Sequence, residues 1–129
     1  MKIIYPLLIF CLFQKISFSQ NRQLNDSLTV FQQEASLFSN SYIFYSNGTF
    51  KHFFNTDDGH TWYGTGTYED KGNKRVLKFG DPDLNFKKEF GSIHYESNFE
   101  RTLKISGKKF LSKDYYYTTR KRIVVFAGR

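Results

Sequence analysis

Turn-forming residues recur along the chain and separate short runs of aromatic and β-branched residues. The clearest case is Asn47-Gly48, which lies between the strand-forming runs 42–45 and 50–54. An Asn-Gly pair in this position is the strongest short signal for a β-hairpin, because both residues accept a positive φ at low cost. Further turns are expected at 56–59, 70–73 and 80–83. Short strands at a spacing of about 8–12 residues predict an antiparallel β-sandwich or barrel.

The loop of this hairpin decides which side chains share a face of the sheet. A two-residue loop would set Phe44 opposite Lys51. A three-residue loop with Gly48 in a bulge would set Phe44 opposite Phe50, which makes a better apolar face. Because strand register follows the apolar face, we predict the second register.

Composition favours a sheet with an aromatic interior. Aromatic residues make up 19% of the chain, and aromatic side chains suit pleated, half-buried surfaces. Gly64 and Gly66 interrupt an expected strand at 61–68, and glycine inside a strand marks a bulge, a barrel corner or a close backbone approach. Further strands are expected at 76–79, 86–90, 93–96, 102–105, 110–111, 115–118 and 123–126.

Residues 27–38 are compatible with two structures. Apolar residues recur there at three- and four-residue spacing behind a potential helix cap, which predicts a short N-terminal helix. The members of this pattern are Leu28, Phe31, Ala35 and Phe38. Residues 29–31 would also suit a strand. We expect the helix.

Three segments within residues 41–79 carry a resemblance to a known family. They read Tyr42-x-Phe44-x-x-Asn47-Gly48-Thr49-Phe50, Tyr63-Gly64-x-Gly66-Thr67-Tyr68 and Leu77-x-Phe79. This progression resembles that of small exported bacterial lipocalin-like domains, and it implies an all-β fold, a small antiparallel up-and-down barrel. Such a barrel has an interior just wide enough for side chains or for one small ligand. The residues expected to face inward, and so the candidates to line a ligand site, are Tyr42, Phe44, Phe50, Tyr68, Leu77 and Phe79.

The N-terminal residues have the order of a secretory signal peptide. Lys2 precedes an apolar run at 3–13, and small residues follow before a potential cleavage site at position 20. The run is shorter than the about 20 residues that span a membrane. We therefore expect a signal peptide at 1–19, a single lipocalin-like β-domain at 20–129, and export to the periplasm or the medium. The one cysteine lies within the signal peptide.

Charge is unevenly distributed along the chain. Residues 101–129 contain nine basic residues and one acidic residue. Such a segment can attract an anionic surface or polymer, and its most basic stretch is Arg120-Lys121-Arg122. A lysine-rich outer face that keeps sheet edges from pairing with other chains explains the same bias.

The motifs of common enzymes are missing from the sequence. It has no serine elbow, no cysteine nucleophile outside the signal peptide and no phosphate-binding glycine loop. His52, His60 and His94 lack close metal-ligand spacing, although His52, His94 and Glu96 could meet across strands. We expect no enzyme activity, no cofactor, no metal, no nucleic-acid partner and no transmembrane segment.

Two functions remain open on the sequence alone. The first is a binding protein that holds a small apolar or amphipathic molecule in an aromatic-lined barrel, which the aromatic content and the hairpins favour. The second is an interaction protein that uses the basic segment 101–129 on an anionic surface. We favour the first, and the sequence leaves the oligomeric state open.

Overall fold

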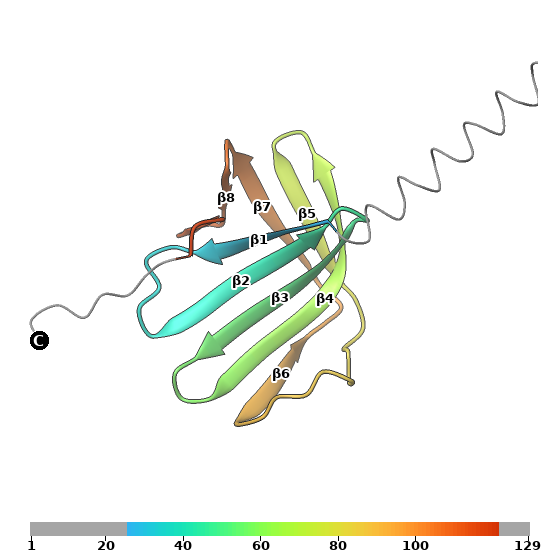
Figure 1. Ribbon diagram of the computed structural model, residues 1–129. Helices are drawn as coiled ribbons and strands as arrows, with labels where there is room; N and C mark the ends of the chain where they lie inside the picture. The colour runs from blue at the N-terminus through green and yellow to red at the C-terminus, as the bar shows by residue number, and fades with distance from the viewer. Residues whose placement is uncertain (1–25, 122–129) are drawn as a thin grey trace, which may run out of the picture.

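The computed structural model describes residues 26–121 (Figure 1), so the expected signal peptide, Arg122 and the expected strand at 123–126 lie outside the described residues. The described part contains β-strands and no helix, hence none that could cross a membrane. Its strands are β1 (Ser27–Gln32), β2 (Phe38–Tyr45), β3 (Thr49–Thr56), β4 (His60–Lys71), β5 (Lys74–Phe79), β6 (Ser92–Glu96), β7 (Glu100–Ser106), β8 (Lys109–Leu111) and β9 (Tyr116–Thr118).

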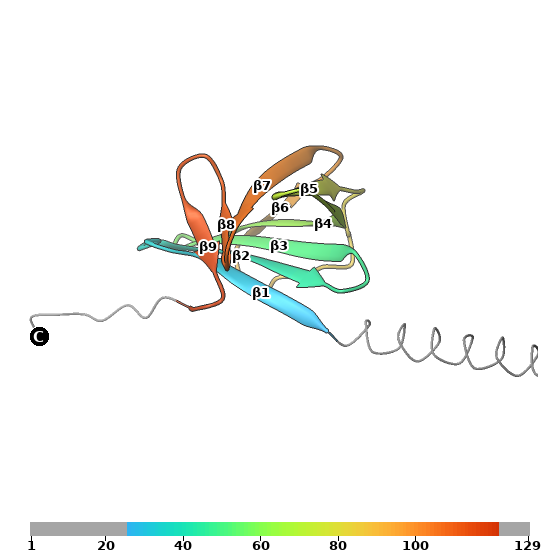
Figure 2. The ribbon, with the colours of Figure 1, turned by 90° about the horizontal axis from the view of Figure 1, so that it is seen from above.

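Eight of these strands close into an antiparallel barrel (Figures 1 and 2). Around the wall the order is β1, β2, β3, β4, β5, β7, β8 and β9, and β9 pairs again with β1. Each pair of neighbours in this ring is antiparallel. Because the order in the wall follows the order in the chain, the predicted all-β, up-and-down barrel is confirmed.

The β2–β3 hairpin has the predicted register. Phe44 lies opposite Phe50, and the side chains of both residues are buried. Gly48 has a φ of 90° and its N–H donates to the carbonyl of Tyr45 at 3.0 Å, as a three-residue loop with a bulge requires. The apolar face therefore decided the register, as expected.

The expected helix at 27–38 is wrong. Residues 27–32 form β1, which pairs with β2 on one side and with β9 on the other. Alternate side chains of this strand, Val30 and Gln32, are buried in the barrel. These two strand pairings close the wall of the barrel. Their stabilising contribution, made by residues far apart in the sequence, outweighs the local spacing of apolar residues that also fits a helix.

The expected strand at 86–90 is also wrong. These residues belong to the connection between β5 and β6, which runs along the outside of the barrel. Phe86 stacks there on Tyr63, with 4.0 Å between the ring centroids, and Tyr63 is itself buried. Phe86 thus packs on the outer face of β4, whereas Phe90 is exposed, and neither residue extends the sheet.

Strand β4 changes its neighbour halfway along, at the two glycines. Its first half pairs with β6 in parallel, and its second half pairs with β5 in the antiparallel sense. A Cβ atom on Gly66 would lie 1.8 Å from the carbonyl oxygen of Lys78, so the backbones of β4 and β5 come together only because Gly66 has no side chain. Since β6 is the last strand in the sheet order, the wall is not continued by pairing beyond it.

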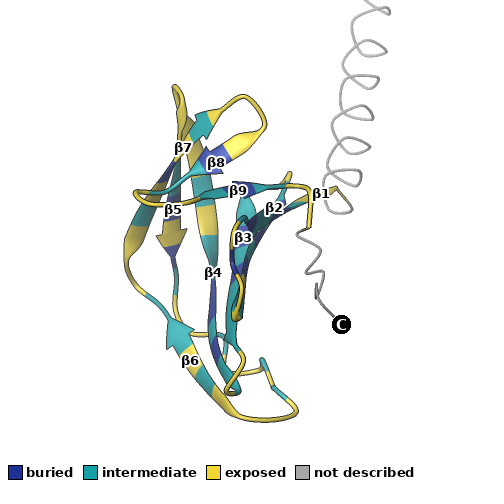
Figure 3. Ribbon diagram, turned by 90° about the vertical axis from the view of Figure 1, so that its left-hand side faces the viewer, coloured by how far each residue is buried: buried dark blue, intermediate teal, exposed yellow. Residues whose placement is uncertain are grey.

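The interior is packed with aromatic side chains along most of its length. Buried segments of the strands are dark blue in Figure 3. The buried cluster consists of Val30, Tyr42, Phe44, Phe50, Leu77, Phe79, Leu103, Phe110 and Tyr117. Near the β4–β5 turn the guanidinium of Arg75 lies 4.4 Å from the ring centre of Tyr68 and 4.7 Å from that of Phe44. Arg75 also makes a two-point ion pair with Asp70, at 2.6 and 2.8 Å. The barrel is thus packed from this end to its middle, apart from a hollow of about 280 Å³ beside Phe44, Tyr68 and Arg75.

Candidate functional site

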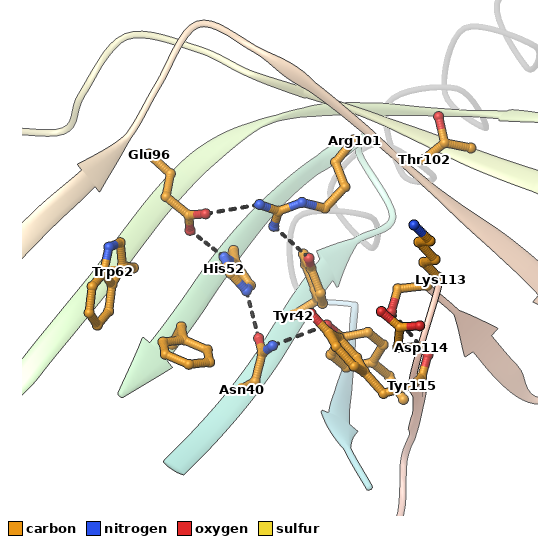
Figure 4. A pocket seen from close by; sticks show the side chains of 13 residues that line it. Asn40, Tyr42, His52, Trp62, Glu96, Arg101, Thr102, Lys113, Asp114 and Tyr115 are labelled. Carbon is orange, nitrogen blue, oxygen red and sulfur yellow. Dashed lines mark hydrogen bonds and ion pairs between the residues drawn. The ribbon is translucent and has the colours of Figure 1, made fainter. Parts of the chain in front are cut away.

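A cavity of about 440 Å³ lies at the other end of the barrel interior, beside the aromatic core (Figure 4). One rim is formed by β6 and β7 and the other by the β8–β9 loop, residues 112–115, so the cavity lies where the wall is not continued past β6. Its lining consists of Asn40, Tyr42, His52, Phe54, Trp62, Glu96, Arg101, Thr102, Ser112, Lys113, Asp114, Tyr115 and Tyr117.

The register of β2, β3 and β4 brings the floor of this cavity together. Tyr42 lies opposite His52, and Phe54 lies opposite Trp62. Because successive side chains of a strand point to opposite faces, these residues share the inner face. The parallel register places Gly64 beside Glu96, and the missing side chain of Gly64 leaves room for the ring of Phe79 and for the backbone carbonyl of Glu96.

A chain of polar contacts crosses the cavity floor (Figure 4). Nε2 of His52 lies 2.6 Å from Oδ1 of Asn40, and Nδ1 of His52 contacts Oε1 of Glu96. Arg101 donates from Nη2 to Oε2 of Glu96 at 3.1 Å and from Nη1 to the hydroxyl of Tyr42 at 2.8 Å. The chain therefore links β2, β3, β6 and β7 through side chains, where β6 has backbone pairing on one edge only.

Two further hydrogen bonds hold Asn40, the residue at one end of these polar contacts, in place. The Nδ2 of Asn40 donates to Oε1 of Gln32 at 2.9 Å and to the hydroxyl of Tyr117 at 3.1 Å. In residues 26–121 every buried side-chain nitrogen and oxygen has a hydrogen-bond partner. The polar floor is thus held in one arrangement by contacts within the protein.

The titratable groups of the floor are perturbed by burial and by one another. Burial lowers the pKa of His52, and the hydrogen bond and charge of Glu96 oppose this effect only in part. Burial alone would raise the pKa of Glu96, but the contact with His52 and the charge of Arg101 outweigh it and hold this pKa below its usual value. Glu96 and Arg101 carry opposite charges in direct contact, so this pair adds no surplus of either sign to the floor.

Aromatic rings form the apolar part of the cavity. Phe54 packs edge-on against Trp62 with a centroid distance of 5.4 Å, and the other side of Trp62 stacks on His94 at 4.6 Å. Tyr115 stands at the rim, 43% exposed. Trp62 is the single tryptophan of the chain, so its fluorescence reports on this cavity alone.

The six candidate lining residues are brought together inside the barrel, but their relation to the cavity differs. Tyr42 lies on the cavity floor. Phe44, Phe50, Leu77 and Phe79 pack in the buried cluster, and Tyr68 packs against it. Two of the six, Phe44 and Tyr68, also border a separate hollow of about 280 Å³ near Arg75. Ligand contact by these six residues stays a prediction.

The basic candidates lie away from the cavity. Arg120 and Lys121 are exposed residues beyond β9, and the carbonyl of Arg120 accepts a hydrogen bond from Nε2 of Gln33 at 2.7 Å. Arg122 is outside the described residues. Arg101, which belongs to the same basic segment, points inward and pairs with Glu96. Within residues 101–121 the basic side chains therefore do not all lie on one surface.

The three histidines have different environments. His52 meets Glu96, whereas His94 stacks on Trp62 and its Nε2 lies 3.0 Å from Nδ1 of His60. Within residues 26–121 no group of three or more His, Cys, Asp or Glu side chains is arranged to hold a metal ion. The cross-strand set of His52, His94 and Glu96 is thus divided between two separate contacts.

Several residues that line the cavity were not predicted from the sequence as lining residues, although some of them could have been. Asn40 is two residues before Tyr42, and His52 and Phe54 continue the alternation that begins at Phe50, so extending the inward set along both strands would have found them. Glu96 was named only as a residue that could meet His52 across strands, because the parallel pairing of β6 with β4 joins segments about 30 residues apart. Arg101 carried no signal, because it reaches the site from β7, which pairs with β5. Comparison of the chain with protein-family models, with curated proteins and with solved structures gives no match.

Proposed function

We propose that this chain is an exported, non-enzymatic binding protein that holds a compact amphipathic molecule in the cavity between β6, β7 and the β8–β9 loop. The carrying observation is the cavity itself, because its volume of about 440 Å³ lies within the range of about 300–1,000 Å³ that is usual for ligand sites. Export is supported by the signal-like order of residues 1–19.

The lining supports a ligand with an apolar ring and an uncharged polar group. Trp62, Phe54 and Tyr115 offer faces and edges on which a flat ring can pack. The charged residues of the lining occur as both signs, Glu96 with Arg101 on the floor and Lys113 beside Asp114 at the rim. A strongly charged ligand would lose its hydration without a surplus of opposite charge in return.

The floor also supports binding without chemistry. Both ring nitrogens of His52 and both carboxylate oxygens of Glu96 contact other protein groups. A general acid or base must reach the reacting proton of its substrate directly or through one water. Here the ring nitrogens of His52 and the carboxylate oxygens of Glu96 are already used in contacts that join neighbouring strands.

The test uses Trp62 fluorescence with N-phenyl-1-naphthylamine, a neutral aromatic amine, as the probe. We expect saturable quenching at one probe per chain, with an affinity that is unchanged between low and high salt, because burial is not screened by ions. Tyr115→Ala should weaken binding about threefold to tenfold, since it removes one ring contact of about 0.5–1.5 kcal/mol.

Tyr116→Ala is the matched control. Tyr116 is the next residue in the chain, but its ring lies against the amine of Lys109 on the outer face, 4.8 Å away. This variant should bind the probe as the parent does. Equal losses in the two variants, or quenching that does not saturate, would rule out the proposed cavity site.

A further inference from the structure

Three lysines stand in one straight row across neighbouring strands. Lys71 of β4 lies directly opposite Lys74 of β5, and Lys74 lies directly opposite Lys104 of β7. All three are exposed. Lys104 follows the buried Leu103, so its side chain points to the outer side of the barrel, and the directly paired lysines share this face. We call Lys71, Lys74 and Lys104 the lysine row. Strand spacing places its members about 4.8 Å apart at the backbone.

The row is extended by lysines of the adjacent turn and has little acidic compensation. Lys108 and Lys109 follow β7 at the same end of the barrel, and both are exposed. The one ion pair to the row within residues 26–121 joins Lys71 to Glu69 at 4.0 Å, with both side chains about two-thirds exposed. Such an exposed pair contributes little. The outer face of this end is therefore locally cationic.

This arrangement works against the stability of the sheet. Like charges directly opposite each other on neighbouring strands destabilise the pair, whereas threonine or an acidic residue at any of these positions would relieve the repulsion. Residues that lower the stability of the fold are expected where a protein contacts a partner. An anion placed along the row would convert the repulsion into attraction.

We propose that the lysine row binds a linear polyanion, of the class of acidic polysaccharides, independently of the cavity and of its proposed ligand. A polymer with one charge per sugar ring presents its charges in a line, as the row does. A bilayer surface fits less well, because within residues 26–121 no exposed large apolar residue belongs to β4, β5 or β7, the strands that carry the row; these residues are Leu28, Leu37, Leu84, Phe90, Phe99 and Tyr115.

The experiment measures binding to immobilised polygalacturonate, with neutral dextran as the reference. The test variant is Lys71→Thr/Lys74→Thr/Lys104→Thr, and the matched control is Lys51→Thr/Lys87→Thr/Lys121→Thr, which removes the same charge from other places. We expect the test variant to bind about tenfold more weakly and with a shallower dependence on salt, and the control to stay near the parent. Equal losses would show that net charge alone acts, and would overturn the proposal.

Two further measurements test the class of the partner and the repulsion within the lysine row. Binding of the parent to phosphatidylglycerol vesicles in preference to polygalacturonate would overturn the proposal in favour of a membrane surface. Lys74→Thr alone should raise the melting temperature by about 1–4 °C at low salt, with a smaller gain at high salt, because it removes two like-charge pairs. A melting temperature that falls would overturn the argument that the row opposes stability.

Discussion

Replacing Gly66 by alanine tests the close approach that shapes the barrel. The added Cβ would lie 1.8 Å from the carbonyl oxygen of Lys78 and 3.0 Å from a ring carbon of Phe50. The oxygen belongs to the backbone of β5, which pairs with β4 through Gly66 and its neighbours. It cannot move away unless this pairing opens, so the clash must be relieved by separating the two strands.

The expected cost follows from two contributions. Overfilling a packed region costs about 1–3 kcal/mol, and each backbone hydrogen bond that is stretched or lost adds about 0.5–1.5 kcal/mol. We therefore expect Gly66→Ala to lower the free energy of unfolding by about 2–4 kcal/mol. For a domain of this size that corresponds to a fall in melting temperature on the order of 10–25 °C.

Thermal unfolding followed by far-ultraviolet circular dichroism measures this fall, and Gly80→Ala is the control. A Cβ on Gly80 would meet its nearest atom, the carbonyl oxygen of Thr65, at 3.9 Å, an ordinary contact. That variant should lie within about 1 kcal/mol of the parent or be slightly more stable, because alanine restricts the unfolded chain. If both variants melt within a few degrees of each other, the backbones of β4 and β5 do not approach as described.

Two other outcomes are expected. Gly48→Val should cost about 1–3 kcal/mol in urea unfolding, because a β-branched residue is strained at the φ of 90° that the turn requires; Gly48→Asn should cost less, and equal costs would contradict a strained turn. Stability should fall as the pH drops below the ordinary His52 pKa of 6.5 and again below that of Glu96, 4.5, because each folded pKa is lowered, so the unfolded chain binds the proton more readily. His52→Gln should flatten the first step in urea unfolding between pH 8 and 4. A stability that rises on acidification to pH 5.5 would show instead that His52 is held as an imidazolium.

The fold could be predicted where local and non-local preferences agree. In the β2–β3 hairpin the Asn47-Gly48 loop and the facing pair of Phe44 and Phe50 favour the same register. In residues 27–32 they disagree, because the apolar spacing fits a helix while the open edge between β2 and β9 requires a strand. The sequence of this segment shows the local spacing that fits a helix, whereas the requirement for a strand between β2 and β9 arises only in the closed barrel.

The site could be predicted only in part, for a related reason. Tyr42 was found because it alternates with Phe44 along one strand. Glu96 reaches the cavity from β6, a short strand that pairs in parallel with β4, and Arg101 reaches it from β7, which pairs with β5. No residue pattern within either strand indicates its partner. The row of Lys71, Lys74 and Lys104 was hidden likewise, since its members become neighbours only when the barrel closes.

The aromatic packing between Arg75 and the cavity closes the cavity at its inner end, so the ligand proposed for it would enter and leave by one mouth, between β6, β7 and the β8–β9 loop. A molecule that enters past the β8–β9 loop must leave by the same route, so arrival and departure cross one common barrier. A substitution that only narrows the mouth would therefore slow both rates by the same factor and leave the equilibrium affinity unchanged. A ligand longer than the cavity would keep its far end in solvent, where a second protein could contact it while it is still bound here.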